Sequence, residues 1–264
     1  VNLSWLVPGV VGGSEEATTR ALRALGAMRS SEVEVVLFGL DALRRAHPDL
    51  TARFESHTLP VPGRLKPLRV AAEHSWLRAM VVRHGIKVLH DAGGTSAGRI
   101  GVPRILTVHD IQPLELPRNF NPVKVAYLRF AVPRAVASAA LVLVPSQFVK
   151  DRLVEHLHAD ADRIEVVPWS APLPVEPMPI DTVRARYGII GNVLLVPAIT
   201  YPHKDHVVAI RAMRHLADRH GETTLVLTGG EGPAEDQVLV EIERQGLGDR
   251  VVRTGRIPET AVAA

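Results

Sequence analysis

Short apolar runs alternate with longer stretches of helical spacing along this chain, and this alternation restricts the fold more than any other feature. Runs rich in Val, Ile and Leu occur at residues 1–7, 33–38, 86–90, 104–109, 140–144 and 164–167. They are short and apolar on both faces, which is typical of buried parallel strands. Between them, helices are expected at residues 15–29, 67–84, 121–139 and 146–157. The alternation therefore predicts an α/β fold with a parallel sheet covered by helices on both faces.

Two of these helices carry local signals. Pro133 lies inside the stretch 121–139, so that helix is expected to be kinked or broken there. Ser146 precedes the stretch "QFVKDRLVEHL" and is expected to cap the N-terminus of that helix.

A proline-rich segment divides the chain. The stretch "VPWSAPLPVEPMPI" (167–180) contains five prolines, a density that neither helices nor central strands tolerate. Alternation then restarts, with strands expected at 192–197, 223–228 and 250–254 and helices at 203–219 and 234–245. We expect an N-terminal Rossmann-like domain (1–170), a linker (171–180) and a second Rossmann-like domain (181–264). Two such domains facing each other would form a cleft at the carboxyl ends of their strands.

The two ends of the sequence add a further expectation. The chain begins inside an apolar run without Met and stops at "IPETAVAA", where a helix has just begun. The second domain is therefore expected to be truncated.

Composition excludes several classes of protein. The 264 residues are 46% hydrophobic and 22% charged, which argues against disorder, and the chain lacks the cysteines that disulfides or thiolate metal sites need. The formal net charge of +3 and the lack of a basic run give no reason to expect a nucleic-acid partner. The longest apolar run, 135–145, is too short to span a bilayer, and no signal peptide is visible. We expect a cytoplasmic protein and leave peripheral contact with a membrane open.

A pair of glycines, Gly12 and Gly13, separates the first run from the first helix. Glycine lets a ligand approach the backbone, and a helix N-terminus offers unpaired N–H groups and partial positive charge, so a diphosphate could bind here. A plain tight turn is the alternative. Glu15 and Glu16 suit the helix dipole but would repel a phosphate if they pointed at it. The G-x-G-x-x-G fingerprint is absent, which disfavours a nicotinamide cofactor.

Two side chains are candidates for catalysis. His109 ends a strand in "ILTVHDIQPLELP" and is placed to donate to a sugar hydroxyl or a phosphate, although a His–Asp pair that caps the loop is the alternative. Lys204, in "PAITYPHKDH", falls near the first turn of a helix and could stabilise a departing diphosphate. A solvated surface lysine is the alternative for Lys204.

The remaining candidate motifs are glycines and histidines at strand ends. Gly229, Gly230 and Gly232 in "LTGGEGP" could let the backbone meet a nucleoside, or form a plain loop. "HDAGG" (90–94) is expected to line the acceptor side. His203, Asp205 and His206 lack an evident further ligand, so no metal site is expected. His47, His156 and His158 are expected to be surface residues.

Taken together, these pieces resemble the retaining glycosyltransferases of family 4 (group 1), which have the GT-B architecture. The matching stretches are "GGSEEATTRAL", "TVHD", "LVLVPSQFVKDRLVEHLHADADRIEVVPWS", "YPHKDH", "LVLTGGEGP" and "LGDRVVRTGRIPETAVAA". The resemblance implies sugar transfer from a nucleotide-sugar donor to a glycan, a lipid-linked sugar or a small metabolite, with retention and without a metal or other cofactor. It also implies that the second domain holds most of the donor and the first domain the acceptor.

The resemblance further assigns roles to particular residues. Gly12 and Gly13 would approach the donor diphosphate, Lys204 would neutralise it, and His109 would sit beside the transferred sugar. Gly230 and the backbone around Arg256 and Ile257 would lie by the base.

Two departures from the family pattern matter. Many relatives carry an Arg shortly before the lysine, where this chain has "PAIT". The two-glutamate E-x7-E motif would lie beyond residue 264, so this stretch alone is expected to be inactive and its parent active. The rival interpretations are a nucleotide- or phosphosugar-binding module, a sugar-nucleotide epimerase of the same architecture, and a nicotinamide oxidoreductase. A convincing carboxylate pair for an epimerase is not found.

Overall fold

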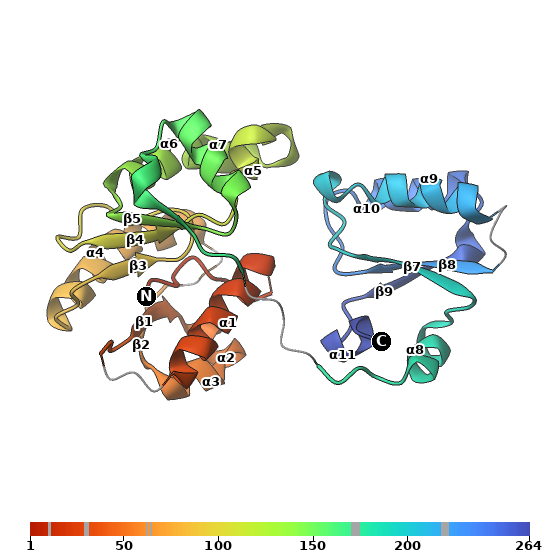
Figure 1. Ribbon diagram of the computed structural model, residues 1–264, viewed down its shortest axis with the longest axis horizontal. Coiled ribbons are helices and arrows are strands. Elements are labelled where there is room, and N and C mark those ends of the chain that lie inside the picture. Colours follow the sequence, from red (N-terminus) through yellow and green to blue (C-terminus); the bar gives the residue numbers. More distant parts are fainter. Residues whose placement is uncertain (10–11, 29–31, 62, 64, 170–174, 218–221) are drawn as a thin grey trace. The chain divides into compact units, whose positions relative to one another are not determined.

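The computed structural model describes residues 1–9, 12–28, 32–61, 63, 65–169, 175–217 and 222–264. The chain forms two compact units, Val1–Ala171 (unit 1) and Pro172–Ala264 (unit 2), each built on parallel strands (Figure 1). The α/β class that the alternation predicts is confirmed.

The elements of unit 1 follow one another in α/β order. Its strands are β1 (Val36–Leu40), β2 (Glu55–Leu59), β3 (Leu89–Asp91), β4 (Arg104–Thr107), β5 (Leu141–Val144) and β6 (Ile164–Val166). Its helices are α1 (Gly13–Ala27), α2 (Asp41–Ala46), α3 (Pro48–Arg53), α4 (Lys66–Arg83), α5 (Gln112–Glu115), α6 (Pro122–Ser138) and α7 (Gln147–Leu157), with 3-10 turns η1 (Pro117–Asn119) and η2 (Ala161–Arg163).

The N-terminal segment joins two groups of parallel strands in unit 1. β1 pairs with β2, and β3 to β6 pair in chain order. Asn2 bridges the two groups through Phe38 of β1 and Asp91 of β3. The expected strand 1–7 is therefore wrong in length, because pairing stops after this bridge. Ser4 donates both its N–H and its hydroxyl to Asn2 Oδ1, at 3.1 and 2.8 Å, and this local turn ends the extended segment.

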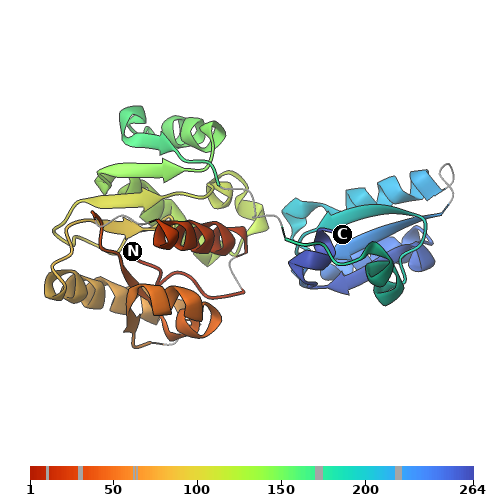
Figure 2. The same cartoon turned by 60° about the horizontal axis from the view of Figure 1, so that its bottom comes forward.

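Helices pack on both faces of this sheet, as Figures 1 and 2 show. In β1, Leu37 packs with the core formed by α1, α2 and α3, whereas Val36 and Phe38 pack with α4. Alternate residues of a strand point to opposite faces, so one short strand contributes to two cores.

Of the two local signals in unit 1, Ser146 caps a helix as predicted, whereas Pro133 does not end one. Ser146 caps α7, because its Oγ accepts the Val149 N–H at 3.3 Å. The helix α6, however, continues through Pro133. Buried residues on both sides of the proline, Val132 and Ala135 among them, pack in the same core, and this packing compensates for the lost backbone hydrogen bond. The elements β2, α2, α3 and α5 were not predicted.

Unit 2 repeats the pattern on a smaller scale. Its strands are β7 (Asn192–Pro197), β8 (Thr223–Thr228) and β9 (Val251–Gly255), in the order β7-β8-β9 and all parallel. Its helices are α8 (Ile180–Tyr187), α9 (His206–Ala217), α10 (Glu235–Arg244) and α11 (Glu259–Val262), with 3-10 turns η3 (Pro202–Lys204) and η4 (Gly248–Arg250).

The sheet of unit 2 lies between two pairs of helices. α9 and α10 cover one face, and α8 and α11 lie on the other (Figure 1). Leu225 and Leu227 of β8 pack with the first pair and Val226 with the second. No helix in the described part of the chain combines the length and apolarity needed to cross a bilayer.

Two boundaries in unit 2 differ from expectation. The helix expected at 203–219 begins only at His206, because Asp205 adopts a left-handed conformation (φ 46°) that a continuous helix does not allow. Residues 218 and 219 of that expectation lie outside the described residues, as do residues 171–174 of the expected linker. The last linker position, Ile180, already begins α8, a helix that was not predicted.

Candidate functional site

The helix α1 starts at two glycines, Gly12 and Gly13, so its first backbone groups are not covered by side chains of their own. Gly12 caps the helix with φ 67°, and its carbonyl accepts the N–H of Glu15 at 3.0 Å. A Cβ at Gly12 would meet open space, although its φ would strain any L-residue. A Cβ at Gly13 would lie 3.5 Å from the indole ring of Trp169. The positive end of the helix dipole is thus bordered by one aromatic side chain.

His109 follows β4 and lies between two indole rings. Its ring centroid is 5.8 Å from that of Trp5 and 5.5 Å from that of Trp169. Burial lowers the pKa of the His109 imidazole, so the ring is neutral at physiological pH.

The hydrogen bond of His109 fixes which nitrogen carries the proton. Nε2 lies 2.9 Å from the Ala92 carbonyl oxygen, which can only accept, so Nε2–H is the donor. Nδ1 is then an acceptor; it is buried and has no hydrogen-bond partner among the described residues. The predicted donation to a ligand is therefore corrected, because the neutral ring has only an accepting nitrogen left.

Trp169 links two residues that the sequence analysis treated separately. It contacts Gly13 and stacks edge-on against His109, and 46% of its surface is exposed. It was missed because it stands in the proline-rich stretch, where nothing local indicates a site.

Gly93 of "HDAGG" has a packing role, because a Cβ there would clash with the indole ring of Trp5.

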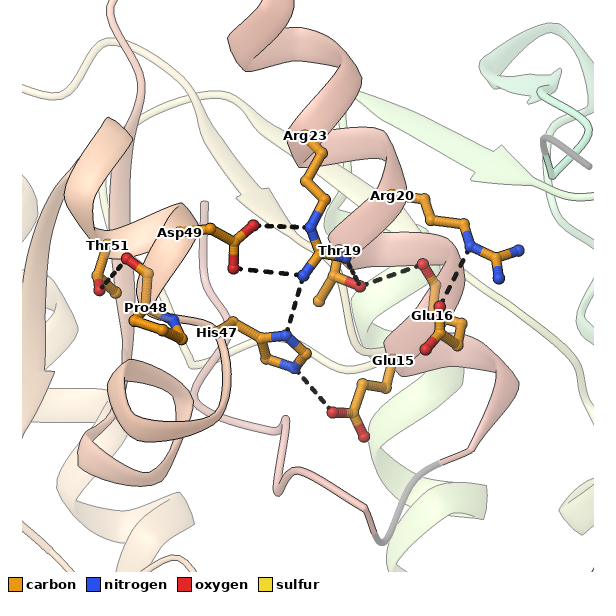
Figure 3. A network of polar contacts seen from close by, with 9 residues as sticks. All are labelled: Glu15, Glu16, Thr19, Arg20, Arg23, His47, Pro48, Asp49 and Thr51. Atoms are coloured by element: carbon orange, nitrogen blue, oxygen red, sulfur yellow. Dashed lines mark hydrogen bonds and ion pairs between the residues drawn. The ribbon is translucent and has the colours of Figure 1, made fainter. Parts of the chain in front are cut away.

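The carboxylate of Glu15, in the first turn of α1, is held by two hydrogen bonds. Glu15 Oε2 accepts the Gly9 N–H at 2.7 Å, and Oε1 lies 2.9 Å from His47 Nε2 (Figure 3). Arg23 lies 3.2 Å from His47 Nδ1, and a guanidinium can only donate, so Nδ1 accepts and Nε2–H donates to Glu15. Asp49 accepts from Arg23 at 2.7 Å and completes the network. The prediction that His47 is a surface residue is wrong, since only 13% of its side chain is exposed.

In unit 2, the predicted residues lie at the carboxyl ends of its three described strands. Gly229 has φ 125°, and a Cβ there would lie 2.5 Å from the Ala198 carbonyl oxygen, so only glycine fits. A Cβ at Gly230 would lie 3.7 Å from Arg256 Nε, so these two residues are neighbours. Ile257 packs against the core under α8 and α11, which leaves its backbone as the part a ligand could meet.

Lys204 and the histidines around it lie in the segment after β7. Lys204 is exposed and ends η3, just before α9 rather than within its first turn. His206 is 2% exposed, and its Nε2–H donates to the Ala198 carbonyl at 3.2 Å. One ring nitrogen of His206 is thus engaged by the backbone, and the expectation that His203, Asp205 and His206 hold no metal stays a prediction.

Solved structures have a similar fold. The chain is similar to HepE of Anabaena in complex with UDP-glucose (TM-score 0.72, 19% identity), and the match covers 99% of this chain and 70% of HepE. It is also similar to WaaG, a glycosyltransferase involved in lipopolysaccharide biosynthesis (TM-score 0.66, 17% identity), over 95% of this chain and 68% of WaaG. These likenesses define the class of fold as that of the GT-B glycosyltransferases.

The sequence identifies the family within that class. Residues 11–170, more than half of the chain, match the family described as Glycosyltransferase Family 4. The chain belongs to this family. It is also 27% identical over 281 residues to the 2-deoxystreptamine glucosyltransferase of Streptomyces kanamyceticus, covering 93% of this chain and 70% of that enzyme.

Proposed function

We propose that the full-length parent of this chain transfers a sugar from a nucleotide-sugar donor to an acceptor, with retention of the anomeric configuration and without a catalytic metal. Membership of glycosyltransferase family 4 is the observation that carries this proposal. The HepE complex with UDP-glucose and the glucosyltransferase of Streptomyces support UDP-glucose as the first donor to test.

The donor diphosphate needs positive charge as the glycosyl–phosphate bond breaks, because negative charge accumulates on the leaving group. Without a metal, the protein must supply this charge. Lys204 provides a full positive charge, and the backbone at Gly12 and Gly13 provides a helix N-terminus without obstructing side chains. The backbone at Gly229, Gly230 and Arg256–Ile257 is proposed to hold the nucleoside.

His109 is assigned to the transferred sugar. Its Nδ1 is an unprotonated acceptor that is buried in this structure, so a sugar hydroxyl can donate to it only after the groups that cover it move. Trp5 and Trp169 hold the ring from two sides. The proposed contact is therefore oriented by packing as well as by the Ala92 hydrogen bond.

The test is an assay of the full-length parent with UDP-glucose and 2-deoxystreptamine, followed by other nucleotide sugars and acceptors. UDP release that depends on the acceptor, together with a glycosylated product, supports transfer. Donor binding without release favours the binding module, and an epimerised sugar nucleotide favours the epimerase.

Retention and metal independence need their own measurements. The anomeric proton of the product, observed by NMR, should show the same configuration as the donor. Turnover after removal of metals with EDTA should equal turnover with Mg²⁺. Inversion, or a strict requirement for Mg²⁺, would contradict the corresponding part of the proposal.

Peripheral contact with an anionic membrane is proposed for one face of α6. Val123, Tyr127 and Phe130 are 79%, 39% and 58% exposed and lie at helical spacing on one side of this helix. The Arg134 guanidinium stacks on the Phe130 ring, 3.6 Å from its centroid, so this face is both apolar and basic. Co-sedimentation with anionic vesicles, weakened by Phe130→Ser, would test it; a cytoplasmic location stays a prediction.

A further inference from the structure

Three potential metal ligands converge in unit 1 away from the residues assigned to sugar transfer. Glu55 and His57 lie on β2, and His84 is the C-cap residue of α4. One ligand atom from each of the three lies within 4.8 Å of the others. We propose that Glu55, His57 and His84 bind one divalent transition-metal ion of the zinc class.

Local structure explains how the three side chains meet. Residues two apart on a strand point to the same side, so Glu55 and His57 share one face of β2. β2 pairs in parallel with β1, which places His57 beside Phe38. The helix α4 ends at His84, whose N–H donates to the Met80 carbonyl at 3.0 Å. The end of the helix thus brings a second imidazole to the strand.

The rings of the two histidines are held in place by packing. Their centroids are 4.0 Å apart, and both lie against the fully buried ring of Phe38, at 5.9 Å for His57 and 6.5 Å for His84. The side chains of His57 and His84 are only 27% and 20% exposed. Less conformational entropy is then lost when a metal orders them.

The ligand atoms are close enough together to share one metal ion. Glu55 Oε1 lies 3.3 Å from His84 Nδ1 and 2.7 Å from His57 Nε2. Bonds of about 2.0–2.1 Å at tetrahedral angles separate neighbouring ligand atoms by about 3.3 Å. The Glu55–His57 separation has to widen when a metal binds, and the side chain of Glu55 is 48% exposed, so solvent on one side leaves room for this change.

The ligand set selects the kind of metal. Two imidazole nitrogens and one carboxylate oxygen suit Zn²⁺ and its neighbours, whereas Mg²⁺ and Ca²⁺ prefer oxygen alone. A water molecule would complete a four-coordinate site. Binding would cross-link β2, which among the described strands pairs with β1 alone, to the end of α4. The expected consequence is stabilisation of unit 1.

The test is calorimetric titration of ZnCl2 into the metal-free, tag-free chain, together with the absorption spectrum of the Co²⁺ form. The wild-type chain should bind one Zn²⁺ and show the d–d bands of a tetrahedral Co²⁺ site. His57→Gln, His84→Gln and Glu55→Gln should each weaken binding by more than about tenfold. His215→Gln, which changes an exposed histidine of α9, should leave it unchanged.

Two results would overturn the proposal. One is the absence of saturable Zn²⁺ binding by the wild-type chain. The other is equal affinity in the wild-type chain and in Glu55→Gln; because Glu55 is exposed, this variant is expected to fold whatever the effect of the two histidine changes. The titration does not depend on sugar transfer, so its outcome is separate from that of the proposed function.

Discussion

At the scale of single residues, the proposed chemistry depends on where hydrogen atoms and charges are fixed. The Ala92 carbonyl sets the tautomer of His109, and Arg23 sets that of His47. A carbonyl oxygen can only accept and a guanidinium can only donate, so in both cases the partner decides which ring nitrogen is protonated.

Replacement of Lys204 tests the charge assigned to the donor diphosphate. We expect Lys204→Ala in the full-length enzyme to lower turnover at least about a hundredfold, because a lost charge-stabilising donor costs about 3 kcal/mol of barrier. The control is Lys87→Ala, which removes an exposed lysine of unit 1. Steady-state kinetics that give near-normal turnover for Lys204→Ala would remove this residue from the role.

Replacement of His109 separates transfer from binding. We expect His109→Ala to lower turnover roughly tenfold, the effect of one lost hydrogen bond, and to change UDP affinity less. Kinetics and calorimetry on the same preparation measure the two effects. A loss of nucleotide affinity with normal turnover of bound donor would contradict the assignment.

The shifted pKa values of the adjacent residues His90 and Asp91 should make the free energy of unfolding depend on pH. Burial lowers the pKa of His90 from 6.5 to about 4, and burial raises the pKa of Asp91 from 3.8 to about 6. Below pH 6.5 the unfolded chain binds a proton at His90 that the folded chain does not, so stability falls as the pH approaches 4. Below pH 6 the folded chain binds a proton at Asp91 before the unfolded chain does, which opposes that loss.

Removal of His90 should remove its share of this pH dependence and leave that of Asp91. Between pH 7 and pH 4.5, we expect the free energy of unfolding of His90→Gln to rise relative to wild type by roughly 2–3 kcal/mol. Urea unfolding at both pH values measures this difference, and His215→Gln is the control. If the difference in free energy of unfolding between His90→Gln and wild type is the same at both pH values, the pKa of His90 is not lowered in the folded chain.

At the scale of elements, the N-terminus of α1 is positioned by contacts from the segment between α2 and α3. His47 connects Glu15 to Arg23, and Arg23 connects to Asp49 (Figure 3). The network joins residues 24 to 32 positions apart, which the local pattern of α1 does not reveal.

Breaking this network should destabilise the protein more than breaking a surface ion pair. We expect His47→Ala to lower the free energy of unfolding by about 1–3 kcal/mol, because Glu15 loses a partner in a half-buried position. The control is Arg44→Ala, which breaks an exposed pair with Asp41 and should change stability by less than about 1 kcal/mol. Equal effects in urea unfolding would argue against a special role for His47.

At the scale of the whole molecule, each unit has its own sheet and its own buried clusters. The three tryptophans, at positions 5, 76 and 169, all lie in unit 1. Tryptophan fluorescence therefore follows unit 1 alone, whereas circular dichroism follows both units.

This difference makes the proposed donor site testable without an acceptor. UDP at about 100 times its Kd should stabilise unit 2 by about 2.7 kcal/mol, because it is proposed to bind mainly there. We expect the transition seen by circular dichroism to move to higher temperature more than the one seen by fluorescence. The opposite order would place the nucleotide on unit 1.

Most regular elements could be predicted because buried parallel strands are continuous apolar runs. The strand β2 was missed because its sequence, "ESHTL", is half polar, as a strand with one neighbour can be. The segment 1–7 was overextended because an apolar run does not show where a side chain such as Ser4 ends the pairing.

The α/β class, the two-part order of elements and the glycine turn before α1 could be predicted from the residues alone, because they depend on periodicity and on backbone freedom. The folded chain was needed to show that Trp169 lies beside both Gly13 and His109. It was also needed to show that Glu15 turns toward His47 and that Glu55, His57 and His84 meet. Those contacts connect distant positions, and side chains far apart in the chain become neighbours only once the sheet and its helices have packed.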